Sequence, residues 1–318
     1  MRRLGRRSWA WLVMALVGGV GLAGCAETVT DPPPTPSPAP ASTTPQDPLE
    51  RAGQAVVTVR AEGSAASGVV LTADGYVLTS DTVTAGGSMT VTLAGGESLE
   101  ATLVGTDRRT QLAVVRLSGA AELLPASFAP QPAAAGTEVR SVSGPELPGG
   151  GPGEVLATDQ LVGAVSVILT DAPADPGSAG GPVLDAAGAV VGIITGSIAP
   201  ADGSAPTAIA VPADLAVRVA EQLIDDGEVT HPYLGVSMED TGGGGAQVRE
   251  VVGGGPADRA GLRPGDVITG LGGRPVDGPG TVVAVVQAGA AGDELTVEYT
   301  RDGVSGEARV TLGEAPAG

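Results

Sequence analysis

The residues with the clearest chemical pattern form a glycine-rich turn, Gly177-Ser178-Ala179-Gly180-Gly181-Pro182. Glycines on both sides of small residues allow the backbone to turn sharply, so that N–H groups point into a common space. Convergent N–H groups of this kind can bind an anion or a polarised oxygen. Only Ser178 carries a hydroxyl in this turn, because residue 179 is alanine. The turn is the first candidate site.

The elements around this turn are short and rich in β-branched residues. From Gln54 onward, apolar runs such as AVVTVR and QLAVVRL alternate with glycine, aspartate and serine. Asp74-Gly75 between two apolar runs is a hairpin signal. Many short strands at close spacing predict antiparallel barrels or sandwiches. Within this region the run PGGGPG, residues 148–153, is predicted to be a flexible surface loop.

Residues 211–226 change to helical spacing. Leu215, Val219 and Leu223 recur at this spacing behind Pro212, and Gly227 ends the run. The sequence therefore predicts a helix that links the β-rich region to the C-terminal part of the chain.

The turn and its neighbouring phrases resemble the trypsin-like serine proteases of the HtrA/Deg family. Residues 170–182 match the family's nucleophile loop, TDAxxNPGNSGGP, and residues 67–83 match SGxxxxxDGYxxTNxHV. A third phrase, residues 105–117, matches GxDxxxDLAVLKV. The resemblance implies a mostly β chain in which a trypsin-like double β-barrel precedes the linker helix. It also assigns the positions of the catalytic His, Asp and Ser, which here are Thr82, Gln111 and Ala179.

These three substitutions remove the chemistry that the resemblance would imply. Serine-type hydrolysis needs a nucleophile, a base that takes its proton and a group that orients the base. Alanine, threonine and glutamine fill none of these roles near neutral pH. The backbone N–H groups of Gly177 and Ala179 are kept, so the resemblance implies an oxyanion-hole-like nest that holds a peptide carbonyl without cutting it. The resemblance therefore favours a pseudoprotease.

An active endopeptidase with a non-standard site is the alternative. Ser178 lies beside the nucleophile position and would have to attack instead. It would lack a base, because the chain has no Lys and its single His, His231, lies in the linker. A third interpretation is a regulatory subunit that associates with active HtrA-like relatives.

Residues 231 to about 312 resemble a PDZ domain, and GGGPADRAGLRPGDVITGLGGRPV carries this match. The resemblance implies a groove that binds the C-terminal or unfolded segments of exported proteins by adding them as a strand. A second helix is expected over 281–287. Its valines face the core or the groove, and the spacing leaves open which ones do. The carboxylate-binding loop is expected at Tyr233, Leu234, Gly235 and Val236.

The N-terminus reads as an export signal. MRRLGRRS is basic, an apolar run follows, and Leu22-Ala23-Gly24-Cys25 ends it. This end resembles the lipobox of bacterial lipoproteins, which implies lipidation of Cys25 and anchoring at the extracytoplasmic face of the cell membrane. An unmodified signal peptide is the alternative. The proline-rich segment that follows favours an extended tether.

The composition of the chain limits the classes of partner that we expect it to bind. The formal charge is −19 over 318 residues, and about −23 without the four Arg of the signal, which disfavours nucleic acid. Cys25 is the only cysteine, so no intrachain disulfide can form. The chain has no Cys/His cluster and no P-loop, so no metal or cofactor is expected. The predicted division is signal 1–24, tether 25–48, trypsin-like domain 49–227 and PDZ domain 228–314.

Overall fold

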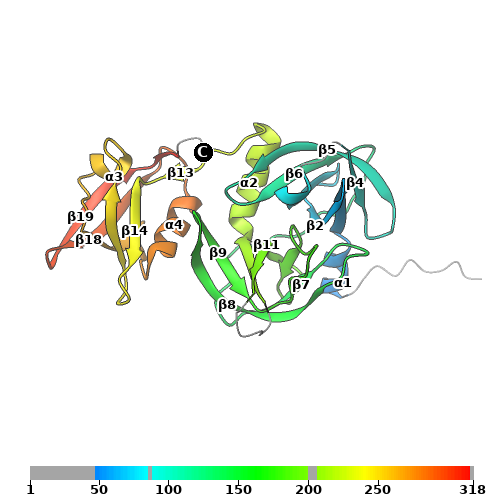
Figure 1. Ribbon diagram of the computed structural model, residues 1–318, viewed down its shortest axis with the longest axis horizontal. Helices are drawn as coiled ribbons and strands as arrows, with labels where there is room; N and C mark the ends of the chain where they lie inside the picture. Colours follow the sequence, from blue (N-terminus) through cyan, green and yellow to red (C-terminus); the bar gives the residue numbers. More distant parts are fainter. Residues whose placement is uncertain (1–46, 85–87, 200–205, 316–318) are drawn as a thin grey trace, which may run out of the picture. The chain divides into compact units, whose positions relative to one another are not determined.

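The computed structural model describes residues 47–84, 88–199 and 206–315 (Figure 1). The predicted signal peptide, Cys25 and all but the last two residues of the predicted tether lie outside the described residues. Residues Thr44–Gly318 form one compact unit. Among the described residues, the helices are too short or too polar to cross a bilayer.

The first half of the unit is a closed barrel of six antiparallel strands, in the order β1-β2-β3-β6-β5-β4. A short helix, α1 (Pro48–Gly53), precedes it and is capped by Asp47, whose side chain accepts the N–H of Leu49 at 2.9 Å. Valines fill the interior because alternate strand residues face inward. The strands are β1 (Val56–Ala61), β2 (Ser64–Val70), β3 (Tyr76–Ser80), β4 (Met89–Thr92), β5 (Ser98–Asp107) and β6 (Leu112–Leu117), with the 3₁₀ turn η1 (Asp81–Val83) after β3.

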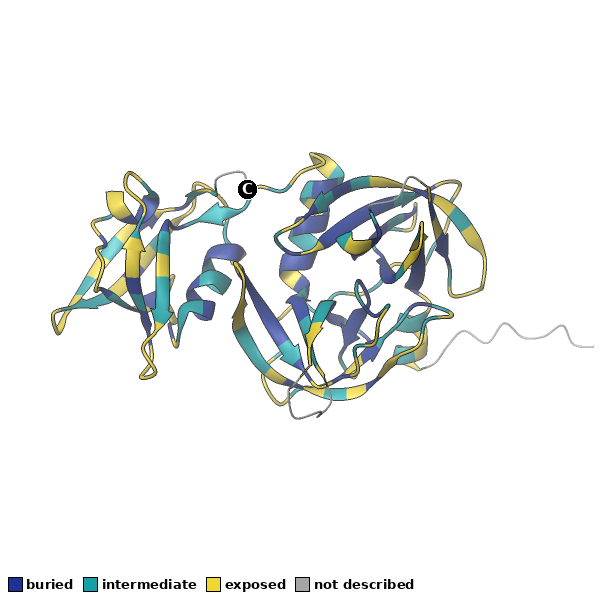
Figure 2. Ribbon diagram, viewed as in Figure 1, coloured by how far each residue is buried: buried dark blue, intermediate teal, exposed yellow. Residues whose placement is uncertain are grey.

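A second closed barrel follows, in the order β10-β11-β12-β9-β8-β7. Its interior holds buried residues that include Val155, Ile168 and Ile194. In Figure 2 the buried colour follows the strands of both barrels. The strands are β7 (Glu138–Val142), β8 (Gly150–Val162), β9 (Val165–Thr170), β10 (Pro182–Leu184), β11 (Val190–Ile198) and β12 (Thr207–Pro212).

The prediction of a flexible loop at residues 148–153 is wrong over most of its length. Gly150 to Gly153 begin strand β8 and pair with β7, Val142 opposite Gly150 and Val139 opposite Gly153. The glycines allow a close approach, since a Cβ on Gly153 would lie 2.3 Å from the backbone nitrogen of Ala172. Glycine here serves tight backbone packing within a barrel.

The predicted linker helix is present as α2 (Ala213–Asp225). Its apolar face carries Leu215, Val219 and Leu223, which are buried in one cluster with residues of both barrels, Val114 and Ile193 among them. The helix therefore closes the apolar space where the two barrels meet.

The C-terminal domain is a twisted antiparallel sheet with two helices. Strand β14 is an edge strand of the order β14-β15-β16-β18-β19, and β13 pairs with β20. A separate apolar core includes Val248, Ile268 and Val297. The elements are β13 (Pro232–Tyr233), β14 (Val236–Asp240), β15 (Ala246–Val251), α3 (Pro256–Arg259), β16 (Val267–Leu271), β17 (Arg274–Pro275), α4 (Pro279–Ala288), β18 (Glu294–Arg301), β19 (Val304–Thr311) and β20 (Gly313–Glu314).

Candidate functional site

The glycine-rich turn is seated against the first barrel. Ser67 at the middle of β2 donates its N–H to the carbonyl oxygens of Gly177 and Ala179, both at 2.9 Å, and its hydroxyl to that of Gly177 at 2.7 Å. Gly180 has φ +81° and packs so tightly that a Cβ would lie 2.2 Å from the carbonyl oxygen of Ser67. The turn therefore requires glycine at 180 both for its conformation and for space.

The three segments that carry Thr82, Gln111 and Ala179 contact one another. Gly180, next to Ala179, packs on the backbone of Ser80 at the end of β3. Thr82 follows on η1, and its hydroxyl donates to the Ser80 hydroxyl at 3.0 Å. The carbonyl of Gln111 accepts the N–H of Asp81 at 3.1 Å. The structure thus brings together the segments that sequence reasoning had grouped by resemblance.

The side chains at the three predicted triad positions, Thr82, Gln111 and Ala179, do not accept a proton at neutral pH. Gln111 holds a left-handed conformation, φ +59°, which is unusual for glutamine. The nearby carboxyl group of Asp81 is half-buried, and this burial raises its pKa although Arg108 opposes the shift. Asp175, which lies just before the glycine-rich turn, is exposed.

Ser178 is held in a structural role. The residue is 1% exposed. Its hydroxyl accepts the N–H of Asp175 at 3.0 Å and shares a hydrogen bond with the Ser143 hydroxyl, also at 3.0 Å. A hydroxyl that is buried and bonded on two sides is poorly placed to attack a substrate.

The backbone N–H groups of Gly177 and Ala179 donate to no group in the part of the chain that the structure describes. Neighbouring N–H groups in the turn are used: Ser178 donates to Asp175 at 2.9 Å and Gly180 to Ile194 at 2.7 Å. The two N–H groups of the predicted nest are therefore available as hydrogen-bond donors, which the binding of a carbonyl oxygen requires.

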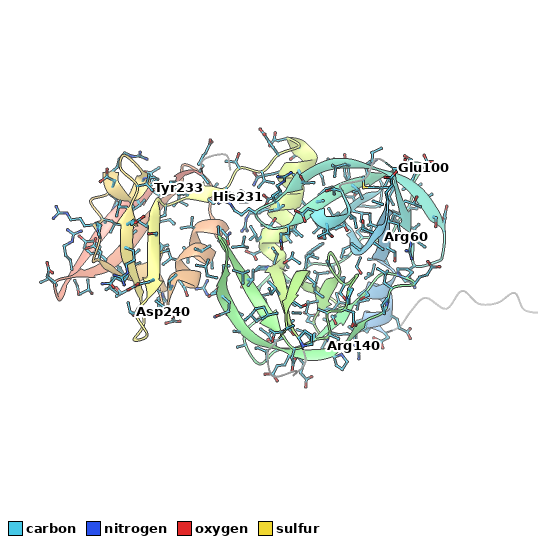
Figure 3. The ribbon with its side chains drawn as sticks, in the orientation of Figure 1. Arg60, Glu100, Arg140, His231, Tyr233 and Asp240 are labelled. Atoms are coloured by element: carbon cyan, nitrogen blue, oxygen red, sulfur yellow. The ribbon has the colours of Figure 1, made fainter. Side chains whose placement is uncertain are left out.

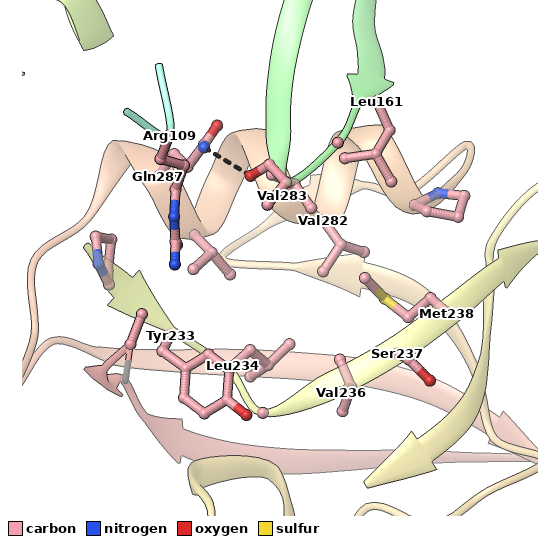
Figure 4. A pocket seen from close by; sticks show the side chains of 17 residues that line it. Arg109, Leu161, Tyr233, Leu234, Val236, Ser237, Met238, Val282, Val283 and Gln287 are labelled. Carbon is pink, nitrogen blue, oxygen red and sulfur yellow. Dashed lines mark hydrogen bonds between the residues drawn. The ribbon is translucent and has the colours of Figure 1, made fainter. Parts of the chain in front are cut away.

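A second candidate site is an apolar groove of about 380 Å³ between β14 and α4. Val282, Val283 and Val286 of α4 line it, opposite Val236 and Met238 of β14 (Figure 4). The sequence had left the orientation of the valines open. Val285 does not line the groove and instead packs against the core of the C-terminal domain.

The segment Tyr233-Leu234-Gly235-Val236 forms one end of this groove. Gly235 has φ +85°, so the loop needs glycine for its left-handed backbone and not only for space. The carbonyls of Leu234 and Gly235 accept N–H groups of Ala257 and Val252, both at 2.9 Å. The N–H groups of Leu234 and Gly235 donate to nothing within the described ranges. Two free donors beside an edge strand can receive a terminal carboxylate while a peptide pairs with β14.

Four residues of the first domain also line this groove, and sequence reasoning missed all four. Arg109 comes from the loop between β5 and β6, Leu161 from β8, and Gly163 and Ala164 from the turn between β8 and β9. The local pattern of the chain contains no signal for this, because the groove joins residues that are far apart in the sequence. Arg109 is half-buried.

The segment between α2 and β14 is tied to the first barrel by a buried hydrogen bond. His231 was interpreted as a plain linker residue, but its Nε2 lies 2.9 Å from Oδ1 of Asp107 (Figure 3 labels His231). Their side chains are only 11% and 8% exposed. Burial alone would raise the pKa of Asp107, but hydrogen bonds from His231 and Thr110 outweigh it and hold that pKa below its usual value.

The end of α4 is also bonded to the second barrel. The side-chain oxygen of Gln287 accepts the N–H of Ser166 at 3.1 Å, and its nitrogen donates to the carbonyl of Ala164 at 3.2 Å. The guanidinium of Arg218 on α2 donates to the Gln287 carbonyl at 2.6 Å. The groove therefore lies beside hydrogen bonds that join the two domains.

Comparisons with known proteins agree with this architecture. Residues 66–193 match the model of the trypsin-like peptidase domain, and residues 232–312 match that of the PDZ domain. Together with the two six-stranded barrels, these matches confirm the predicted fold class. A solved structure titled "HtrA-type protease AlgW with tripeptide" superposes with a TM-score of 0.68 at 28% identity, over 86% of this chain and 97% of that chain.

The sequence is also similar to curated proteins that are described as serine endoproteases. The chain is 33% identical over 283 residues to a "Probable periplasmic serine endoprotease DegP-like" of Rhizobium meliloti, over 83% of this chain and 56% of the relative. It is 31% identical over 304 residues to a protein of the same description from Ectopseudomonas mendocina, over 89% of this chain and 63% of the relative. This chain thus spans less than two thirds of the length of these relatives.

Proposed function

We propose that this HtrA-like chain, a trypsin-like protease domain followed by a PDZ domain, binds the C-terminal or unfolded segments of exported polypeptides without cutting them. One observation carries the proposal: free N–H groups at Leu234 and Gly235 end an apolar groove beside the edge strand β14. Strand addition would supply affinity through the main chain, and the carboxylate loop would select chain ends. Such a protein would serve as an adaptor, sensor or holdase in protein quality control.

Features of the first domain support our proposal that the protein does not hydrolyse the bound peptide. Thr82, Gln111 and Ala179 stand on segments that contact one another, yet they include no nucleophile and no base. Removal of the Ser or the His of a serine triad lowers turnover by about a millionfold. The free N–H groups of Gly177 and Ala179 would allow this cleft to hold a carbonyl oxygen as a second, weaker contact.

An active endopeptidase is the second candidate, favoured by the names of the relatives, which are serine endoproteases. It would have to use Ser178, and the burial of that hydroxyl counts against it. Labelling of the protein by a fluorophosphonate, abolished in Ser178→Ala, would establish this candidate in place of our proposal. Association with active relatives is a compatible further role, tested by co-purification with such a protease.

We also propose attachment at the extracytoplasmic face of the membrane through Cys25. The relatives are described as periplasmic, which supports export. The lipobox-like residues that end in Cys25 support the lipid anchor. Mass spectrometry of the N-terminal peptide, from the wild-type chain and from Cys25→Ala, tests it.

The binding proposal is tested by calorimetric titration of residues 26–318. The probes are N-acetylated octapeptides that end in Val, Leu, Ile, Phe or Ala, each as the free acid and as the amide. We expect at least one free acid to bind roughly tenfold or more tightly than its amide, since a charged group that meets free N–H donors gains about 1.5–3 kcal/mol. Equal affinity of acid and amide, or no binding of either, would refute the carboxylate loop.

A pair of variants locates the site. Val283→Glu places a charge in the groove and should abolish binding, because Val283 is half-buried in its wall. Val304→Glu is the matched control: Val304 is 70% exposed and lies outside the groove lining. Loss of binding in both variants would point away from the groove.

A further inference from the structure

Among the described residues, one cationic side chain lines the groove of the PDZ domain, and it comes from the other domain. Arg109 belongs to the loop between β5 and β6, yet it lines the groove together with Tyr233, Leu234 and Gly235. In Figure 4 its guanidinium extends toward the Tyr233 end, which is the end formed by the carboxylate loop. Leu161 enters the groove near Val283 instead.

The loop that carries Arg109 is fixed in place. Asp107, 7% exposed, accepts the N–H of Arg109 at 3.2 Å and the hydroxyl of Thr110 at 2.6 Å. The same carboxylate holds His231 at 2.9 Å. His231 stands two residues before Tyr233, so Asp107 sets the position of the arginine and of the carboxylate loop together.

The guanidinium of Arg109 has no carboxylate partner within 4 Å in the part of the chain that the structure describes, although the chain has 36 acidic residues and only 17 basic ones. Other arginines of the same molecule do pair: Arg116 with Asp74 at 2.7 Å, and Arg301 with Asp266 at 2.6 Å. A planar guanidinium group can make two parallel charge-assisted hydrogen bonds to one carboxylate. Arg109 is half-buried, faces an apolar groove and makes no such bond.

We propose that Arg109 binds a carboxylate at the C-terminal end of the peptide in the PDZ groove, so that the ligand site is completed by the protease-like domain. The inference rests on the proposed function, since it needs a peptide in the groove. The N–H groups of Leu234 and Gly235 approach such a carboxylate from one side and the guanidinium from another. Peptide ends would therefore be bound by both domains at once.

The test compares Arg109→Gln with Arg108→Gln in residues 26–318. Arg108 is the matched control, because it is the adjacent arginine, is exposed and lies outside the groove lining. The probe is the tightest octapeptide of the series above, as free acid and as amide. We expect Arg109→Gln to weaken binding of the acid by roughly fivefold to tenfold and of the amide by less than about twofold, since one charge-assisted bond is lost. Arg108→Gln should leave both affinities unchanged.

A second arm identifies the source of the carboxylate. The penultimate residue of the free acid is set to Glu or to Gln and both peptides are titrated against Arg109→Gln. If the variant loses affinity equally for the two peptides, Arg109 binds the terminal carboxylate. If it loses affinity only for the Glu peptide, Arg109 binds the side-chain carboxylate next to it.

The outcomes separate this inference from the proposed function. If wild-type protein does not distinguish acid from amide, the proposed function fails first. If wild type and Arg109→Gln both bind the free acids more tightly than the amides, and by the same factor, the groove binds a terminal carboxylate but the proposed role of Arg109 is refuted.

Discussion

At the scale of single residues, the first domain has kept its backbone donors and has no catalytic side chains at the predicted positions. Gly177 and Ala179 have N–H groups free to bind an oxygen, whereas Thr82 and Gln111 cannot accept a proton at neutral pH. The one hydroxyl in the turn, on Ser178, is used within the fold. Our proposal of binding without cleavage rests on this combination.

We therefore expect that Ala179→Ser does not create a protease. The new hydroxyl would stand where the resemblance places a nucleophile, but it would have no base to take its proton, and loss of the base costs a serine protease about a millionfold in turnover. Casein hydrolysis and fluorophosphonate labelling should both stay at background. The control carries Thr82→His and Gln111→Asp as well. Cleavage by the single variant would show that another base serves this site.

At the scale of elements, the glycine-rich turn depends on strand β2 as much as on its own sequence. Ser67 holds two carbonyls of the turn, and Gly180 fits against the backbone of β2 and β3. The two barrels thus contact each other through main-chain atoms at the glycine-rich turn, which carries the predicted nucleophile position, Ala179. A side chain at 180 would separate them.

Gly180→Ala should therefore be more destabilising than a glycine substitution in open space. Gly119 is the matched control, because it has φ +72° and no atom within 4 Å of an added Cβ. We expect Gly119→Ala to cost about 1–2 kcal/mol for its left-handed backbone. Gly180→Ala should cost about 1–3 kcal/mol more for the overlap with Ser67. Urea denaturation measures both, and equal costs would contradict the packing described for the turn.

At the scale of the whole molecule, the two domains are tied by a few buried polar contacts in addition to the covalent linker. Asp107 at the end of β5 and His231 in the linker form a hydrogen-bonded pair whose side chains are only 8% and 11% exposed. Gln287 adds two hydrogen bonds at the end of α4. A change at Asp107 should therefore affect the stability of the first barrel and the peptide groove together.

The pH dependence of stability follows from the sign of the Asp107 shift. Its pKa is lower in the folded chain than in the unfolded chain, because the hydrogen bonds from His231 and Thr110 overcome the effect of burial. The stabilisation is therefore complete above the unfolded pKa of about 3.9 and is lost as the pH falls through the lower, folded value. Asp81, which faces Asp107, has a raised pKa and contributes with the opposite sign.

We expect Asp107→Asn to lower the free energy of unfolding at pH 7 by about 2 kcal/mol, the scale of a hydrogen bond to a charged group. The Tm of the variant should also fall less than that of the wild type between pH 5 and pH 3. Asp277→Asn is the control, since Asp277 is exposed and its carboxyl has no hydrogen bond or ion pair within the described ranges. Parallel pH curves for wild type and Asp107→Asn would show that the pair does not govern acid stability.

The amino-acid sequence by itself determined the class of fold and indicated where two candidate sites would lie. Periodicity placed the helix now seen as α2, and glycine spacing marked the turn at 177–182. These features are local: they depend on backbone conformation and on which face of one element is apolar. Gly235 belongs with them, since its left-handed backbone is a property of its own loop.

Only the tertiary structure decided which residues meet. PGGGPG was predicted as a loop because glycine and proline are turn-formers, but pairing with β7 and close packing on Ala172 make most of it a strand. The hydroxyl of Ser178 shares a hydrogen bond with that of Ser143, which lies in another loop. The entry of Arg109 into the peptide groove depends on the contact of two domains. Contacts between distant residues are set by the packing of whole elements, and a local pattern contains no record of them.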